Sequence, residues 1–222
     1  MSGVRPVSDS SRTPDDRRES HAEVSDSKSD TNAEKRYYMA CLDLAGRDVL
    51  VVGAGSVALE KIEGLLDAGA RVTVVAPEVS EAVETLARSR HVALIRGRYR
   101  TEDLEGRFLV VAATATRTVN EGVYADAEAR GMLCNVVDVP ELCSFILPAV
   151  HRADPIAVAI STGGASPALA QRLRDEVAGL VTGEHVRLAH DLRELRPWAK
   201  AHLPTYEARR DFFRRLVEDR LG

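Results

Sequence analysis

Two glycines and one aspartate are the residues whose types and positions could do chemistry. Gly53, Gly55 and Ala58 form a Gly-x-Gly-x-x-Ala motif directly after the apolar run 48–52, and Asp138 ends a later apolar run. In such a motif the first glycine permits a tight turn, the second lets the backbone approach a diphosphate, and the small third residue allows close helix–strand packing. The motif predicts dinucleotide binding, and the alternative is a turn with a purely structural role.

The apolar run 71–76 bears on which dinucleotide is bound. It ends in Ala76-Pro77-Glu78 and has no acidic residue at its tip, where one usually binds the adenosine ribose. Glu78 is a substitute for that acid, as are the backbone groups of Ala76 and Pro77. No arginine follows at once to bind a 2′-phosphate, so the sequence favours NAD over NADP.

Two later apolar runs also end in residues of interest. Ala113 and Thr114 follow the run 108–112, and small residues there would let a cofactor approach; the alternative is a tightly packed turn. Asp138 follows the run 132–136, where we expect it to face the nicotinamide. A carboxylate in that place can act as a general base, although an aspartate at a strand end can instead cap a turn.

The elements that must position these residues alternate between strand and helix. The apolar runs show no polar alternation, which is typical of a parallel sheet covered on both faces. We therefore predict an α/β fold, a Rossmann-like doubly wound parallel sheet, over residues 37–148. The predicted strands are 48–52, 71–76, 92–95, 108–112 and 132–136, and the predicted helices cover about 58–68, 80–89 and 119–130.

The pattern changes after Pro148. Phe145–Val150 and Ile156–Ile160 are predicted strands too close together for a helical crossover, so they form a hairpin or add to a partner's sheet. The Gly-rich turn 161–167 leads into a helix that runs to about Val181, with Ser166 as N-cap and Pro167 at its first position. Two Arg-rich amphipathic helices, 184–203 and 205–221, complete a helical C-terminal module over 182–222.

Composition excludes several classes of protein. The balance of 30 Lys+Arg against 34 Asp+Glu gives a net charge of −4, so no nucleic-acid partner is indicated. No apolar stretch approaches the roughly 18–20 residues of a membrane helix, so no membrane association is expected. Residues 1–36 contain no aromatic residue and are crowded with Ser, Asp, Glu and Arg, which predicts a disordered tail.

Cysteine and histidine usage points to a cytoplasmic protein without a bound metal. Cys41, Cys134 and Cys143 form no Cys-x-x-Cys pair and lie in apolar runs, so we expect buried, reduced thiols. The six histidines show no metal-binding spacing, and no fixed metal site is predicted.

Several strings together resemble one family, the precorrin-2 dehydrogenases of sirohaem synthesis, which also form the N-terminal part of sirohaem synthase. The similarity runs in order from about Tyr37 to the C-terminus. Its most specific parts are the Asn-Val-Val-Asp string 135–138 and the Ser-Thr-Gly-Gly-x-Ser-Pro string 161–167. The other strings are 42–53, 113–120 and 143–149.

The resemblance implies NAD-dependent oxidation of precorrin-2 to sirohydrochlorin, and in some members the insertion of Fe²⁺ as a second substrate. It places the catalytic aspartate at Asp138 and cofactor contacts around Ser56-Val57 and Pro77-Glu78. It also implies a homodimer formed through residues 149–181, with 182–222 on the side of the anionic tetrapyrrole. The chain ends at Gly222, where bifunctional synthases carry a methyltransferase domain, so we expect no methylation.

A rival hypothesis is a non-catalytic NAD(H)-sensing module. It would explain the glycine motif and a dimerising C-terminal part, but it leaves Asp138 and the 161–167 turn without a role. Formation of NADH with a tetrapyrrole substrate separates the two hypotheses.

Overall fold

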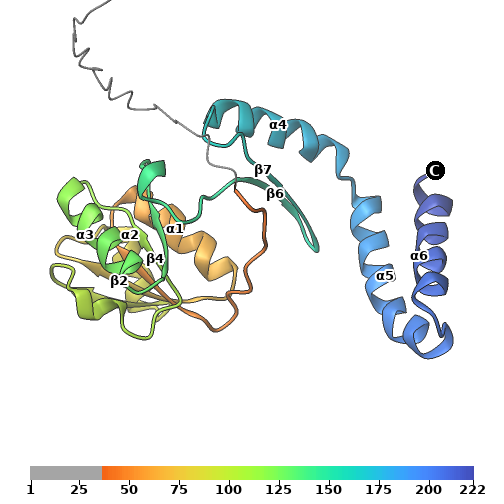
Figure 1. The fold of residues 1–222 in the computed structure, drawn as a ribbon, viewed down its shortest axis with the longest axis horizontal. Helices are drawn as coiled ribbons and strands as arrows, with labels where there is room; N and C mark the ends of the chain where they lie inside the picture. The colour runs from red at the N-terminus through yellow and green to blue at the C-terminus, as the bar shows by residue number, and fades with distance from the viewer. Residues whose placement is uncertain (1–36) are drawn as a thin grey trace, which may run out of the picture. The chain divides into compact units, whose positions relative to one another are not determined.

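The first half of the described chain alternates strands and helices (Figure 1). The computed structural model describes residues 37–222, and the predicted disordered tail, 1–36, lies outside the described residues. The strands are β1 (Asp48–Val52), β2 (Arg71–Ala76), β3 (Val92–Arg96), β4 (Leu109–Ala112) and β5 (Leu133–Val136). The helices are α1 (Ser56–Asp67), α2 (Glu81–Arg88) and α3 (Arg117–Glu128), with short 3₁₀ turns η1 (Thr101–Leu104) and η2 (Pro140–Leu142).

All five strands are parallel, in the order β3-β2-β1-β4-β5. The chain moves outward from β1 to β3 and then returns to place β4 against the free side of β1. This reversal is the topological switch point at which open α/β sheets bind their ligands. The predicted doubly wound sheet is confirmed.

The sheet is buried on both faces. Val49 and Val51 of β1 belong to one apolar cluster, which contains Ile62 of α1. Leu50 points the other way into a second cluster, which contains Val123 of α3. Because alternate residues of β1 enter two different cores, its sequence is a continuous apolar run and does not alternate between apolar and polar residues.

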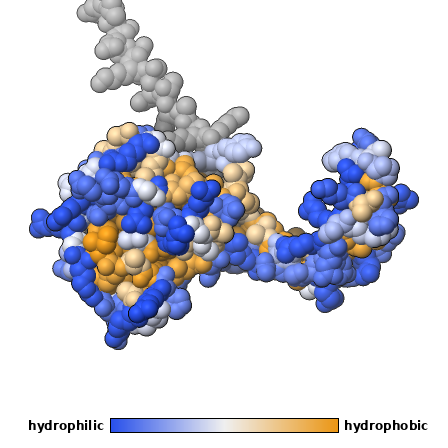
Figure 2. Space-filling model, turned by 90° about the horizontal axis from the view of Figure 1, so that it is seen from below, coloured by the Kyte–Doolittle hydropathy of each residue, from blue (hydrophilic) through white to orange (hydrophobic). Residues whose placement is uncertain are grey.

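The C-terminal part contains a hairpin and three helices. β6 (Ala149–Ala153) and β7 (Ile156–Ile160) pair antiparallel, and α4 (Pro167–Leu180) packs against both strands. Ser166 caps α4, its hydroxyl accepting a hydrogen bond from the Leu169 N–H at 3.2 Å, as the sequence predicted. α5 (Gly183–His202) and α6 (Tyr206–Leu221) pack as a pair. Figure 2 shows their visible surface as mostly hydrophilic, with larger hydrophobic areas over the α/β domain.

One predicted strand is wrong in part. Phe145–Val150 was expected to be extended throughout, but β6 begins only at Ala149. The Phe145 carbonyl accepts a hydrogen bond from the Asn135 side chain, and Phe145 itself packs against a core of the α/β domain. Pro148 has no N–H for a ladder. Residues 145–148 therefore belong to the packing around β5. Smaller shifts occur at α3, which begins at Arg117, and at β4 and β5, which each begin one residue late.

The prediction for the cysteines holds at two of three positions. Cys134 and Cys143 are buried thiols that form no disulfide within residues 37–222, whereas Cys41 is exposed. Cys41 precedes β1 in a segment without regular structure, where Leu44 is the residue that enters the core. None of the helices within residues 37–222 is long and apolar enough to span a membrane.

Candidate functional site

The carboxyl ends of β2, β1, β4 and β5 meet at one edge of the sheet, and the residues just beyond them are tied together. The backbone N–H just after each of three strands donates to a carbonyl at the end of the neighbouring strand, so the hydrogen-bond ladder continues to the end of the sheet. The bonds run from Gly53 N to Val75 O (2.9 Å), from Ala113 N to Val52 O (2.8 Å) and from Val137 N to Ala112 O (3.0 Å). This edge carries nearly all the residues that the sequence singled out.

Gly53 is required by the sheet itself. It is buried, and its φ of 113° lies in a region that side chains rarely adopt. A Cβ at this position would collide with the backbone carbonyl of Ala113. The first glycine of the motif therefore allows β1 to pass closely beside the turn after β4, at the switch point.

Gly55 has a different role. Its φ of −82° is ordinary, it is exposed, and nothing lies within 4 Å of where a Cβ would stand. It is the N-cap of α1, and no side chain caps this helix or places an acid in its first turn. The first N–H groups of α1 are thus left for an external acceptor, and open space lies before them.

The residues around this helix end fit an anionic ligand with an apolar part. Ser56 is exposed, and Val57 is 46% exposed although it is a large aliphatic residue. Ser80, which the sequence did not suggest, lies against the glycine turn because its N–H donates to the Ala54 carbonyl at 3.1 Å. The Ser80 hydroxyl oxygen is buried and has no hydrogen-bond partner among residues 37–222. A buried hydroxyl without a partner beside an uncapped helix end suits a bound phosphate or ribose oxygen.

The three residues predicted to bind the ribose at the end of β2, Ala76, Pro77 and Glu78, differ in exposure. Ala76 is buried, and its carbonyl already accepts a hydrogen bond from Gly97 N at 3.1 Å. Pro77 and Glu78 are exposed. Of the three, Glu78 is therefore the residue whose polar side chain is available to a ribose.

The turn after β4 is held by a residue to which the sequence gave no role. The Thr114 hydroxyl lies 2.8 Å from Asn120 Oδ1, and the Asn120 amide donates to the Thr114 carbonyl at 2.9 Å. The Thr114 hydroxyl also accepts from Thr116 N at 3.2 Å. Asn120 is buried in α3. Thr114 thus shapes the turn with its side chain, and Ala113 and Thr114 offer a ligand mainly their small size.

Asp138 lies in a turn directly after β5. The turn is closed by Val139 N donating to Val136 O at 3.2 Å, and Asp138 adopts a φ of 61° within it. Its side chain is exposed and makes no hydrogen bond or ion pair with any of residues 37–222. It therefore does not cap the turn through its carboxylate, which remains free to accept a proton.

The loop that carries Asp138 is fastened at both ends. The buried Asn135 amide donates to the Phe145 carbonyl at 3.0 Å, and the Cys143 thiol donates to the Val136 carbonyl at 3.2 Å. Ser144 forms a double link to β5, because Cys134 N donates to its hydroxyl at 2.7 Å and Ser144 N donates to the Cys134 carbonyl at 2.9 Å. We call these contacts the β5 clamp.

The buried thiol of Cys134, within the β5 clamp, carries no charge. Burial raises the pKa of the Cys134 thiol to about 12, with smaller contributions from Cys143 and Glu128. The thiol therefore stays protonated and does not place a second negative charge near Asp138. An asparagine within an apolar strand, as at position 135, is the signal by which the sequence could have revealed the clamp.

Together these contacts place a candidate dinucleotide site and a free carboxylate at one edge of the sheet. Gly53, Gly55, Ser56, Val57 and Ser80 lie at the carboxyl ends of β1 and β2, and Asp138 lies beyond β5. The arrangement can hold a dinucleotide across the switch point and can present the Asp138 carboxylate at the same edge of the sheet. Among residues 37–222, no three His, Cys, Asp or Glu side chains gather as a metal centre would require.

Comparisons with known families agree with this geometry. Residues 40–149 match a family model described as putative NAD(P)-binding. Residues 154–180 match a second model, described as the central part of a sirohaem biosynthesis protein.

Individual relatives share the same region. A "Siroheme synthase" of Ectopseudomonas mendocina is 40% identical over 179 residues, and "Siroheme synthase 3" of Aeromonas hydrophila is 41% identical over 180 residues. Each match covers 81% of this chain but only 38% of the relative, so the chain spans less than two-fifths of their length. Among solved structures, "SirC, precorrin-2 dehydrogenase" superposes with a TM-score of 0.71 at 29% identity, covering 84% of this chain and 93% of that one.

Proposed function

We propose that the chain is a member of the family of the precorrin-2 dehydrogenases and of the corresponding region of the sirohaem synthases, and that it oxidises precorrin-2 to sirohydrochlorin with NAD⁺. The observation that carries the proposal is the shared sheet edge. An uncapped helix end beside a glycine turn and an unpaired carboxylate lie at the ends of neighbouring strands.

The chain's own residues define the cofactor site. The α1 N–H groups at Ser56 and Val57 bind the diphosphate, for which Gly55 leaves room, and the Ser80 hydroxyl adds a donor beside it. Glu78 accepts from the ribose, and its negative charge disfavours a 2′-phosphate, which supports NAD rather than NADP. Ala113 and Thr114 allow close approach at β4. The bound NAD⁺ supplies the hydride acceptor.

Asp138 provides the proton acceptor of the reaction. Dehydrogenation of a saturated carbon removes a hydride and a proton, and a general base typically contributes about 10²–10⁴-fold in rate. The Asp138 carboxylate has no internal partner within residues 37–222, so both oxygens are available to the substrate. The β5 clamp fixes the backbone that carries this carboxylate, which reduces the entropy lost on reaching the reactive geometry.

We further propose that the protein is a homodimer formed through residues 149–181. Leu169, Leu173 and Leu180 lie on one stripe of α4 and are 50%, 37% and 71% exposed. Their spacing of four and seven residues places them on one helix face, which a second copy would cover. Residues 182–222 then form the substrate-side module. The thiols of Cys134 and Cys143 are buried and not joined in a disulfide, which suits a cytoplasmic protein.

The test is direct. The purified full chain is incubated without oxygen with precorrin-2, with and without NAD⁺, and NADH and macrocycle absorbance are followed. NADH formed in step with sirohydrochlorin supports the proposal, whereas NAD⁺ binding without turnover would favour a sensor. Because the relatives are named siroheme synthases, a second arm adds Fe²⁺ as a substrate and asks whether sirohaem forms faster than without protein.

A further inference from the structure

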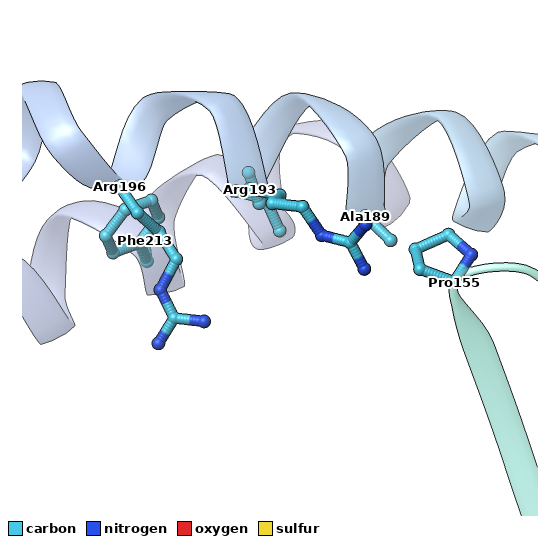
Figure 3. A pocket seen from close by; sticks show the side chains of 6 residues that line it. Pro155, Ala189, Arg193, Arg196 and Phe213 are labelled. Carbon is cyan, nitrogen blue, oxygen red and sulfur yellow. The ribbon is translucent and has the colours of Figure 1, made fainter. Parts of the chain in front are cut away.

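A cavity of about 460 Å³ lies beside the C-terminal helix pair, away from the glycine turn in sequence (Figure 3). It is lined by Pro155 of the hairpin tip, by Ala189, Leu192, Arg193 and Arg196 of α5, and by Phe213 of α6. The wall is therefore apolar apart from two guanidinium groups. We call it the arginine pocket.

The two arginines share one side of α5. Ala189, Arg193 and Arg196 are spaced by four and three residues, which places them on one helix face. Figure 3 shows both arginine side chains leaving α5 on the same side, with the Arg193 guanidinium directed toward Ala189 and Pro155. Lys200, four residues after Arg196, continues this face and is exposed.

These cations have no internal counter-ion. Neither Arg193 nor Arg196 forms an ion pair or a side-chain hydrogen bond with any of residues 37–222. Most other arginines of the C-terminal part do have partners in the structure. The pairs are Arg172 with Glu176, Arg174 with Asp175, and Arg210 and Arg214 with Asp211.

The acids of α5 do not reach this face. Asp191 and Glu194 lie about 100° or more around the helix from both arginines, given 3.6 residues per turn. The helix thus separates its charges, with cations over the cavity and carboxylates elsewhere. An anionic ligand would meet attraction from two guanidiniums without repulsion from a neighbouring acid on the same face.

We propose that the arginine pocket binds peripheral carboxylates of the tetrapyrrole, with Arg193 and Arg196 as the ligands and the apolar wall against the carbon skeleton. The inference rests on the proposed function for the identity of the ligand. A guanidinium recognises a carboxylate through paired N–H donors, and two guanidiniums on one wall select a molecule with at least two such groups. Leu192, Phe213 and Pro155 supply the surface that a small inorganic anion would not use.

The pocket is tested by binding, independently of catalysis. The probe is uroporphyrin, a stable porphyrin with carboxylate side chains on every pyrrole ring, titrated against the full chain by fluorescence. Arg193→Ala and Arg196→Ala are compared with Arg187→Ala, which removes an exposed arginine from another face of α5. Alanine is a good helix former, so α5 is preserved, and circular dichroism checks this.

Each single variant is expected to weaken uroporphyrin binding about fivefold and the double variant about thirtyfold, while Arg187→Ala binds like the parent. Added salt should weaken binding by the parent more than by the double variant. Equal affinity of the parent and the double variant would overturn the assignment, as would an Arg187→Ala loss as large as theirs.

Turnover with precorrin-2 separates this inference from the proposed function. If the pocket holds the substrate, the double variant raises KM with a smaller change in kcat, because binding common to ground state and transition state is lost. Normal KM in an active double variant would refute the pocket and leave the dehydrogenase intact. Arginine-dependent porphyrin binding without any NADH formation would refute the dehydrogenase and leave the pocket intact.

Discussion

At the scale of single residues, Asp138 meets two separate demands. Its backbone has a φ of 61°, a left-handed conformation in which Asn and Asp are enriched among non-glycine residues. Its carboxylate, without a partner within residues 37–222, is also the proposed base. Asparagine meets the first demand equally well and fails the second, so one substitution distinguishes a turn residue from a catalytic one.

We predict that Asp138→Asn lowers dehydrogenase turnover by about 10²–10⁴-fold, since the amide has no basic lone pair at neutral pH. NAD⁺ affinity and melting temperature should stay at parental values, because the turn keeps its left-handed residue. Steady-state rates, calorimetry and thermal melts on one preparation measure all three. Asp138→Gly is the control for backbone conformation, and turnover near the parental rate in Asp138→Asn would remove the base assignment.

Substitutions of the two glycines of the motif should have different effects, one on stability and the other on NAD⁺ binding. Gly53→Ala places a Cβ against the Ala113 carbonyl at a φ of 113°, so the free energy of unfolding should fall by about 3 kcal/mol or more. Gly55→Asp should keep stability, because aspartate is a favoured N-cap, yet abolish NAD⁺ binding through its charge at the diphosphate site. Urea unfolding and calorimetry check both variants. A Gly53→Ala variant of parental stability, or a Gly55→Asp variant that still binds NAD⁺, would contradict these separate roles of the two glycines.

At the scale of elements, the β5 clamp shows how an edge strand is completed. The outward N–H and carbonyl of Cys134 face away from β4, and Ser144 supplies partners for both. Asn135 then fixes the next residue, Phe145, through its carbonyl. The returning segment therefore acts as a partial sixth strand that closes the loop carrying Asp138.

Ser144→Ala should destabilise the domain and loosen this loop. The buried Cys134 N–H loses its acceptor, which costs about 1–3 kcal/mol in the free energy of unfolding. We expect kcat to fall while NAD⁺ affinity, which depends on the α1 end, is kept. Denaturant titration and kinetics measure both effects, and Ser144→Thr, which restores the hydroxyl, should recover them. An unchanged unfolding midpoint in Ser144→Ala would show that the clamp contributes nothing.

The leucine stripe of α4 gives a prediction for assembly. Leu169 and Leu180 are 50% and 71% exposed, so Leu169→Glu and Leu180→Glu should leave the single chain folded. In a dimer that buries them, each substitution would place a charge in an apolar interface and shift the equilibrium toward monomer. Light scattering measures the mass. Gln171→Glu, which adds the same charge on the opposite side of α4, should remain dimeric. If the leucine variants were also dimeric, this face of α4 would not be the interface.

At the scale of the whole molecule, the candidate site, the hairpin and the helix pair all lie within residues 37–222. Residues 1–36 contain no aromatic residue and few of the aliphatic side chains that build a core. Deleting residues 1–36 should leave the melting temperature and turnover unchanged, as thermal melts and NADH assays can show. A clear fall in melting temperature would mean that the tail packs on the domain.

The sequence by itself determined the class of fold and the sheet edge at which the candidate residues lie. Apolar runs without alternation indicated buried parallel strands, and parallel strands place their carboxyl ends together, so Gly53, Ala113 and Asp138 could be assigned to one edge. These inferences succeeded because strand periodicity and sheet polarity are local properties of the chain. The same local pattern also gave the N-cap at Ser166.

The tertiary structure decided what depends on contacts between distant residues. Only the approach of β1 to Ala113 shows that Gly53 is required by the fold, whereas open space surrounds Gly55, the glycine proposed to face the ligand. The Asn135–Phe145 bond holds residue 145 beside β5, before the start of β6, and Cys41 is exposed whereas Leu44 is buried in the core. No periodicity encodes such contacts, because each depends on where a second segment packs once both have folded.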